Sequence, residues 1–575
     1  MNSAEQQKDF WTRGGLPYLI LILLCLAFYL PGLTRMPPTD RDEARFAQAS
    51  RQMVESGNYI DIRFQQNPRY KKPAGIYWLQ AASAAATTGA EKPAIWPYRL
   101  PSLLGALLAV LFTYRFGQAL FGRRAALLGA ALLGSSLILT AEAHLATTDA
   151  VLLACIVAMQ GLLGRIYLRS RRDAPVGTAT ALFFWAACGA GILIKGPIAP
   201  AVALLTMGSL ALADRNLKLL RQLRWRKGIL LLLVMVLPWF LAIGVETKGA
   251  FFRQAVGHDL LPKLAGGQES HGAPFGTFAL LFPLLFWPGS LFAIWALWPS
   301  WKSRAEGAVR FCLAWIVPSW LMFELVPTKL PHYILPTFPA IALLTGYFLC
   351  HPGEFRGYLR QKPFTWLKWL PIALWGIVGV ALAVGLTGLP LMLNHRLFLG
   401  SLAAIAGVAF ILAMVPRLWR KERPASAALC GLLGGLLVLA PAFSLVLPRL
   451  DGPWISRRVL TEVRQLERQP HPVLAAVGFH EPSLVFLLGT QTELTDPAGA
   501  AQNLKAHANG LALVTQREQK AFDAAARKEG VSPVALKTFR GFNYAKGRWL
   551  TLTLYGPAAP APVKTLRMPG EQDPQ

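Results

Sequence analysis

Two adjacent carboxylates, Asp42 and Glu43, follow the first apolar stretch of the chain and stand close to Arg45. Paired acids beside a cation suit a reaction in which a base takes a proton from an attacking hydroxyl. The same acids could also lie in the first turn of a helix that starts near Thr39 or Asp40, where negative charge stabilises the helix dipole. Asp40 fits the helix start, whereas Asp42 and Glu43 remain candidates for catalysis.

A basic cluster lies further along the same segment, where Tyr70, Lys71 and Lys72 directly precede Pro73. Lysine supplies a compact positive charge and tyrosine adds a neutral hydrogen bond, so Tyr70 and Lys72 could hold a phosphate. Contact with phospholipid headgroups is the alternative explanation of this cluster.

Further ionisable side chains lie between apolar runs, where a charge is costly and tends to be functional or paired. Asp149 follows two threonines and could simply complement a helix dipole. Lys195 interrupts an apolar hairpin. Lys329, His332 and Tyr333 occur within a short proline-bracketed turn, and snorkelling toward water explains only the lysine.

A possible metal site lies in the segment 245–273, which contains His258, Lys263 and His271. Two histidines are only a weak indication of metal binding. We expect that no cofactor is required, and a divalent metal near His258 is the alternative.

The composition indicates where these residues must lie. Of the 575 residues, 54% are hydrophobic and only 15% are charged, and the mean hydropathy is +0.39. A soluble chain of this length needs more surface charge, so most of the chain is expected to lie in lipid. The net charge of +28 comes from Lys and Arg clustered in short loops between apolar runs, a pattern that argues against nucleic-acid binding and indicates membrane topology.

The apolar runs predict about thirteen spanning helices, since each span takes roughly 20 residues. If the N-terminus lies in the cytoplasm, every second loop is basic, as the positive-inside rule requires. A span at 72–89 would reverse this alternation, so we expect an interfacial or re-entrant helix there, within a long outer loop at 34–96. All of the candidate polar sites then lie on the outer side of the membrane.

The chain is therefore expected to contain an all-α polytopic membrane domain at 1–446 and a small extracytoplasmic α/β domain at 447–556. A Pro-rich, disordered tail follows at 557–575. The α/β assignment rests on strand-like runs at 473–478, 512–515 and 549–555 and on helix-like stretches at 498–508 and 518–529.

Taken in order, these motifs resemble those of the large membrane glycosyltransferases of the C-type fold. The resemblance is to the bacterial aminoarabinose transferases that modify lipid A, which are related to protein O-mannosyltransferases. The matching pieces are Asp42-Glu43-x-Arg45-Phe46-Ala47, Tyr70-Lys71-Lys72-Pro73, Thr147-Thr148-Asp149, Lys195-Gly196-Pro197, His258 with Lys263, His271-Gly272-Ala273-Pro274-Phe275, and Lys329-Leu330-Pro331-His332-Tyr333.

The resemblance implies a function for individual residues. Asp42 matches the catalytic aspartate, and Lys72 and Tyr333 match residues that contact the carrier phosphate. Lys263 matches a basic position of the same cavity, and Asp149 and Lys195 match further cavity positions. Lys71 stands where the family usually has Glu, so a metal shared between that Glu and His258 would lose a ligand here.

The implied function is an inverting glycosyl transfer at the outer face of a bacterial inner membrane. The donor is a sugar, 4-amino-4-deoxy-L-arabinose or a related one, on undecaprenyl phosphate, and the acceptor is lipid A or another periplasmic molecule. The expected partners are this donor, this acceptor and membrane lipid, without nucleic acid. Transfer to protein is one alternative, and a flippase or transporter for the lipid-linked sugar is the other.

Overall fold

The computed structural model describes residues 14–89, 92–261, 272–351, 369–466 and 472–557. These residues form two units, Met1–Leu450 and Asp451–Gln575. The division lies four residues beyond the expected boundary between residues 446 and 447. The expected tail falls outside the described residues from residue 558 onward.

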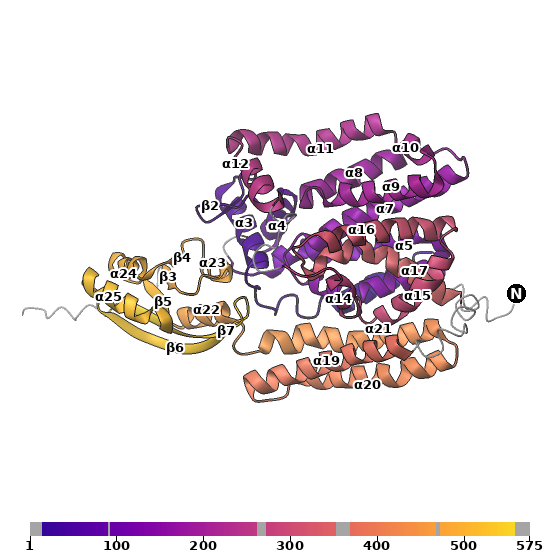
Figure 1. The fold of residues 1–575 in the computed structure, drawn as a ribbon. Coiled ribbons are helices and arrows are strands. Elements are labelled where there is room, and N and C mark those ends of the chain that lie inside the picture. The colour runs from indigo at the N-terminus through magenta and orange to yellow at the C-terminus, as the bar shows by residue number, and fades with distance from the viewer. Residues whose placement is uncertain (1–13, 90–91, 262–271, 352–368, 467–471, 558–575) are drawn as a thin grey trace, which may run out of the picture. The chain divides into compact units, whose positions relative to one another are not determined.

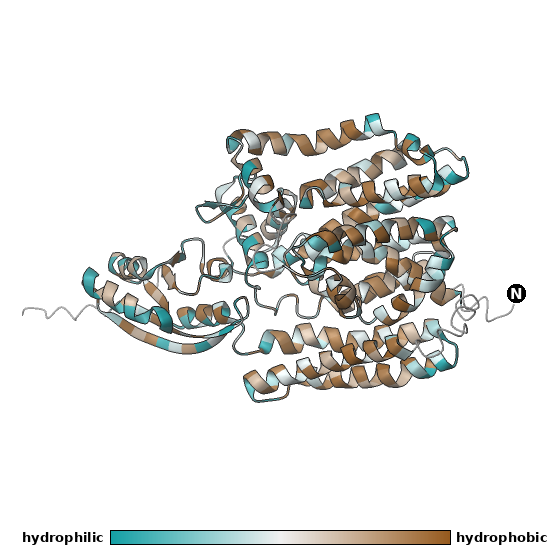
Figure 2. Cartoon of the chain, viewed as in Figure 1, coloured by the Kyte–Doolittle hydropathy of each residue, from teal (hydrophilic) through white to brown (hydrophobic). Residues whose placement is uncertain are grey.

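The first unit is built almost entirely from helices (Figure 1). Its longer helices are α2 Leu16–Tyr29, α3 Asp42–Ser56, α4 Gly75–Thr87, α5 Trp96–Gly134, α7 Asp149–Arg171, α8 Thr178–Lys195, α9 Ile198–Asp214, α11 Trp225–Glu246, α14 Thr277–Leu285, α15 Ser290–Lys302, α16 Gly307–Leu325, α17 Phe338–Cys350, α19 Trp369–Asn394, α20 Leu399–Arg420 and α21 Pro424–Pro441. Its shorter elements are β1 Arg63–Phe64, β2 Asn67–Pro68, α6 Leu137–Ala143, α10 Lys218–Gln222, α12 Ala250–Phe252, η1 Arg253–Leu260, η2 Pro331–Thr337, η4 Ala442–Val446 and η5 Leu447–Arg449. Figure 2 shows that the long helices are hydrophobic over most of their length, with hydrophilic residues toward their ends.

Nine segments among the described residues are long and apolar enough to cross a membrane. Several expected spans fall outside this set for structural reasons. Helix α5 merges two of them in 39 residues, separated by the non-helical backbone of Gly122 at φ 80°. Helices α2 and α9, with 14 and 17 residues, are shorter than a usual span, and the span expected after Pro274 is divided into α14 and α15. The all-helical polytopic membrane domain is confirmed, whereas the number of spans stays a prediction.

The segment between α2 and α5 folds into small elements beside the bundle. It contains α3, the two-stranded β1–β2 hairpin and α4. Helix α3 packs against α4, which in turn packs against α5. With 13 residues, α4 is too short to span a bilayer, which suits the interfacial or re-entrant helix expected at 72–89. Its depth in a membrane stays a prediction.

The second unit is the expected small α/β domain. Its sheet has the strand order β4-β3-β5-β7-β6, in which β3 runs parallel to β4 and β5, and β7 runs antiparallel to β5 and β6. Its elements are α22 Ile455–Gln465, β3 Leu474–Val477, α23 Pro482–Leu488, β4 Glu493–Thr495, α24 Pro497–Ala506, β5 Leu511–Thr515, η6 Gln516–Glu518, α25 Gln519–Glu529, β6 Pro533–Asn543 and β7 Arg548–Pro557. The sequence pattern missed the edge strands β4 and β6, because their mostly exposed side chains lack the apolar signal of the central strands.

Close packing of α5 against α17 depends on two glycines that allow the backbones to approach. A Cβ added at Gly129 would lie 2.6 Å from the carbonyl oxygen of Ala342, and one added at Gly346 would overlap the carbonyl oxygen of Ala125. Small residues permit this approach between membrane helices, where apolar burial alone gives no driving force.

We predict that Gly346→Ala destabilises the membrane unit, because the new methyl group has no space between the two backbones. Overpacking of this kind costs about 1–3 kcal/mol. Gly385→Ala in α19 is the matched control, since its Cβ would meet no atom within 4 Å. Thermal unfolding in detergent should show a lower midpoint for the first variant and an unchanged or slightly higher one for the second. Equal midpoints would contradict the packing argument.

Candidate active site

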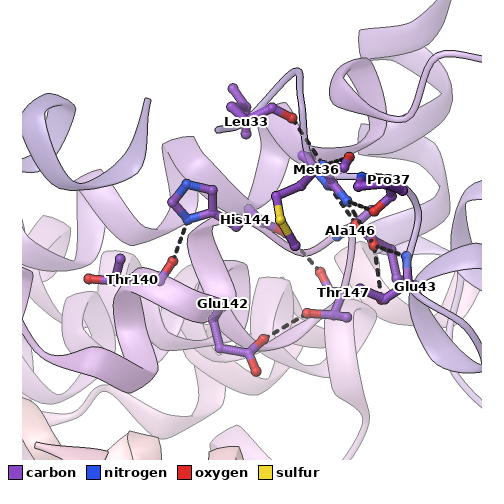
Figure 3. A network of polar contacts seen from close by, with 12 residues as sticks. Leu33, Met36, Pro37, Glu43, Thr140, Glu142, His144, Ala146 and Thr147 are labelled. Atoms are coloured by element: carbon purple, nitrogen blue, oxygen red, sulfur yellow. Dashed lines mark hydrogen bonds and ion pairs between the residues drawn. The ribbon is translucent and has the colours of Figure 1, made fainter. Parts of the chain in front are cut away.

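A buried ion pair fixes the start of α3 against α5. Arg99 has no exposed surface, and its Nε donates to Oε1 of Glu43 at 2.7 Å while its Nη2 donates to Oε2 at 3.0 Å. The remaining guanidinium hydrogens bond the carbonyl oxygens of Leu33, Met36 and Pro37 at 2.7–3.0 Å (Figure 3). Arg99 therefore holds the chain from residue 33 to residue 43 in one arrangement.

The carboxylate of Glu43 is fully engaged by this network. Besides the arginine, Thr39 donates to Oε2 through its backbone N–H at 2.7 Å and its hydroxyl at 2.9 Å, and the N–H of Ala146 donates to Oε1 at 3.0 Å (Figure 3). Glu43 is only 1% exposed. These contacts make Glu43 a positioning residue and leave no lone pair directed at a substrate, unlike the catalytic part expected from the sequence.

Asp42, unlike Glu43, is exposed and is not bound by this network. It is the first residue of α3, it is exposed, and it makes no hydrogen bond or ion pair with the part of the chain that the structure describes. The preceding residue, Arg41, has φ 65°, a conformation that a non-glycine residue adopts only when its surroundings require it. The anchored turn thus presents the carboxylate of Asp42 to the outside of the network.

Asp42 lies close enough to His332 for a Coulomb interaction, and His332 lines a cavity of about 510 Å³, within the size range of ligand pockets. The polar lining also includes Lys72, Asp149, Lys195 and Tyr333. Most of the remaining lining is apolar and includes Phe240, Phe251, Phe252, Met322 and Phe323. A cavity lined by both cationic and apolar side chains suits an amphiphile with an anionic head and a hydrocarbon tail.

Two of the three lysines that line the cavity are held by carboxylates. The Nζ of Lys195 lies 2.6 Å from Oδ1 of Asp149, and the Nζ of Lys72 lies 3.3 Å from Oδ2 of Asp259. The ammonium group of Lys195 also lies 5.2 Å from the centre of the Tyr333 ring. The structure thus brings together Lys72, Asp149, Lys195 and Tyr333, which the sequence placed at four separate motifs.

Tyr70 and Lys329 lie outside the lining of this cavity. The hydroxyl of Tyr70 donates to Oδ1 of Asp61 at 2.8 Å, and burial followed by this bond raises the pKa of Tyr70 to about 12. The Nζ of Lys329 donates to the carbonyl oxygens of Ala273 and Val326 at 3.0 and 2.9 Å. Both side chains stabilise loops around the cavity, where the sequence predicted contact with substrate.

The remaining predicted site residues either do not line the cavity or lie outside the described residues. Arg45 is half-buried on α3 and does not line the cavity. Lys263 and His271 fall outside the described residues, as does the side chain of His258 in η1. No group of three potential metal ligands occurs among the residues that were described. Lys71 lines the cavity, and its ammonium group has no lone pair to offer a metal ion. The alternative of a divalent metal near His258 stays a prediction, because the possible histidine ligands lie outside the described residues.

Glu142 on α6 was not among the residues predicted from the sequence, and it contacts the cavity-lining His332. This carboxylate is 3% exposed, accepts a hydrogen bond from the hydroxyl of Thr147 at 2.8 Å, and lies 3.4 Å from Nδ1 of His332. A carboxylate within an apolar run was the available signal, because such a group must find a partner. His332 was noted only as part of its motif.

Comparisons with known proteins agree with this geometry. The family described as dolichyl-phosphate-mannose-protein mannosyltransferase matches residues 71–241. The crystal structure of ArnT from Cupriavidus metallidurans bound to undecaprenyl phosphate has a TM-score of 0.71 at 19% identity, covering 93% of this chain and 97% of that one. The chain therefore has the C-type fold of membrane glycosyltransferases.

Curated relatives match most of this chain in sequence. An undecaprenyl phosphate-alpha-4-amino-4-deoxy-L-arabinose arabinosyl transferase of Edwardsiella ictaluri is 26% identical over 74% of this chain and 75% of its own length. A second such enzyme, from Pseudomonas fluorescens, is 29% identical over the same shares. An archaeal oligosaccharyltransferase, AglB from Archaeoglobus fulgidus, has a TM-score of 0.52 at 12% identity, covering 94% of this chain and 74% of that one.

We predict that Arg99→Met strongly destabilises the protein, because the carboxylate of Glu43 would stay buried without its cation. Breaking one side of a buried ion pair costs about 3–5 kcal/mol. Thermal unfolding should therefore show a large loss for this variant and a partial recovery when Glu43→Gln is added. The control is Arg63→Met, because the side chain of Arg63 is 51% exposed in its pair with Asp61. Similar losses for Arg99→Met and the control would contradict the anchoring role.

Proposed function

We propose that this protein moves a sugar from undecaprenyl phosphate to a lipid acceptor, with inversion at the sugar carbon. One observation carries the proposal: the exposed carboxylate of Asp42 acts by Coulomb interaction on His332, which lines a cavity together with lysines, a tyrosine and apolar side chains. The names of the relatives support undecaprenyl phosphate as carrier and 4-amino-4-deoxy-L-arabinose as sugar.

The main catalytic task is to stabilise the carrier phosphate as it leaves. Lys72, Lys195 and Tyr333 line the cavity and would receive the phosphate. Preorganised charge of this kind acts strongly where water is excluded. We add Lys263 to these phosphate contacts, because it matches a basic cavity position in the family that the sequence resembles.

Asp42 would act on the acceptor. Its carboxylate takes the proton of the attacking hydroxyl while the acceptor oxygen forms a bond to the anomeric carbon of the sugar. The bond from that carbon to the phosphate oxygen breaks on the opposite face, and its electron pair stays with the carrier phosphate. Attack opposite to the leaving group inverts the configuration.

We place the reaction at the periplasmic face of the inner membrane, with lipid A as the acceptor. The alternation of basic loops supports this orientation, because the site residues then lie opposite to the Lys- and Arg-rich ends. The lipid A and lipid-linked sugar profiles of strains with and without the gene test the acceptor. Sugar found on protein instead would favour the protein-modifying function that the matched mannosyltransferase family describes.

We predict that Asp42→Asn lowers the turnover number by about 10²-fold or more, because loss of a general base removes that much rate. Single-turnover transfer from a labelled donor in nanodiscs measures this effect separately from binding. The matched control is Asp40→Asn, which removes the same charge two residues away and should keep most of the activity. Near wild-type turnover of Asp42→Asn would end the assignment.

We predict that Lys72→Ala weakens donor binding about 10- to 100-fold, the value of one charge-assisted hydrogen bond. Equilibrium binding of a labelled polyprenyl phosphate is the measurement. Lys218→Ala is the control, since Lys218 is exposed and pairs with an exposed aspartate. Unchanged donor affinity would reject the phosphate contact.

A further inference from the structure

Three ionisable groups next to Lys195, namely Asp149, His332 and Glu142, have no part in the mechanism above. The Nδ1 of His332 lies 3.4 Å from Oε1 of Glu142, and its Nε2 lies 3.8 Å from Oδ2 of Asp149. The other oxygen of Asp149 holds Lys195 at 2.6 Å. One imidazole thus separates two buried carboxylates, of which one already has a lysine.

The carboxylate of Glu142 is fixed in its orientation. Thr147 holds Oε2 from one side at 2.8 Å (Figure 3), so Oε1 is the atom that faces the imidazole. Glu142 does not line the cavity, whereas His332 does. His332 is therefore the cavity-lining residue that Glu142 contacts directly.

Other charged groups around His332 come from several elements. Lys72, before α4, and Asp42, at the start of α3, act on the imidazole by Coulomb interaction. The ring of Tyr333 contacts it with centres 5.1 Å apart. Glu324 of α16, which also packs against η2, is engaged elsewhere, because its oxygens accept hydrogen bonds from three backbone N–H groups at the start of α14.

Binding of an anionic phosphate changes the charge balance of this row. In this structure Asp149 neutralises Lys195 at 2.6 Å. A phosphate that draws the ammonium group of Lys195 toward itself weakens that pair. Asp149 is 7% exposed, and a buried carboxylate that loses its cation is costly. His332 is the group already placed to replace the lysine.

We propose that His332 takes up one proton from solvent when the donor binds and so replaces Lys195 as the partner of Asp149. Glu142 is the positioning residue for this exchange. An imidazolium ion donates from both ring nitrogens, so Nδ1–H bonds Glu142 while Nε2–H bonds Asp149. The proposal rests on the proposed function, because its ligand is the carrier phosphate.

Donor affinity measured against pH tests the exchange. The probe is a short-chain polyprenyl phosphodiester that carries a sugar, because a phosphodiester does not itself titrate between about pH 5 and pH 8, where histidine does. In nanodiscs, the affinity of the wild-type protein should rise as the pH falls, by up to about tenfold per pH unit for one linked proton. Calorimetry in buffers of different ionisation enthalpy counts the proton directly.

Two variants separate positioning from structural support. His332→Gln should bind the probe with little dependence on pH, and Glu142→Gln should shift the dependence to lower pH, because the imidazolium loses one of its two carboxylates. His351→Gln, at an exposed position, is the control and should keep the wild-type slope. Thermal unfolding confirms that each variant is folded, and Glu142→Gln serves alone if His332→Gln is not.

The possible results separate a failure of the proton exchange from a failure of the proposed function. A flat wild-type profile, or a slope that survives in His332→Gln, overturns the exchange while leaving the proposed function intact. Failure of the wild-type protein to bind the phosphodiester at any pH rejects the proposed function itself. A loss of stability in Glu142→Gln without any change in slope would show that Glu142 only supports the fold.

Discussion

The arrangement of residues 33–43, and with it the position of Asp42, depends on the ion pair between Arg99 and Glu43. A charge buried in a medium of low dielectric must meet an opposite charge and have its hydrogen-bonding groups satisfied. Arg99 has no exposed surface, and it satisfies this requirement with one carboxylate and three backbone carbonyl groups. The turn before α3 is held by these bonds, and Asp42 is presented within Coulomb range of the cavity-lining His332 as a consequence.

The same constraint shapes the donor site. In the proposed function, Lys72 and Lys195 receive the phosphate of the donor. In this structure, Asp259 and Asp149 neutralise them. A site built in this way stays stable without its ligand, but the ligand must compete with the resident carboxylates. On this proposal, the strength of donor binding depends on whether another cationic group can replace each lysine as the partner of its carboxylate.

Two distinct kinds of packing support this site. The long helices approach closely where glycines remove the side chain, as Gly129 and Gly346 do between α5 and α17. The loops around the cavity are instead held by single polar side chains, such as Tyr70 on Asp61 and Lys329 on two carbonyl groups. The first kind needs only small residues, whereas the second needs a specific partner elsewhere in the chain.

This difference explains what the sequence by itself determined. Apolar runs and alternating strand patterns are local, so they predicted the helical membrane unit and the central strands of the α/β unit. Charges at apolar borders likewise predicted Asp42, Lys72, Lys195 and Tyr333 as candidate site residues. The tertiary structure alone decided that Glu43 anchors the turn, that Tyr70 and Lys329 hold loops, and that Glu142 contacts His332. A side chain's function depends on its partner, and Glu43 finds its partners 56 and 103 residues away, beyond the reach of any local pattern.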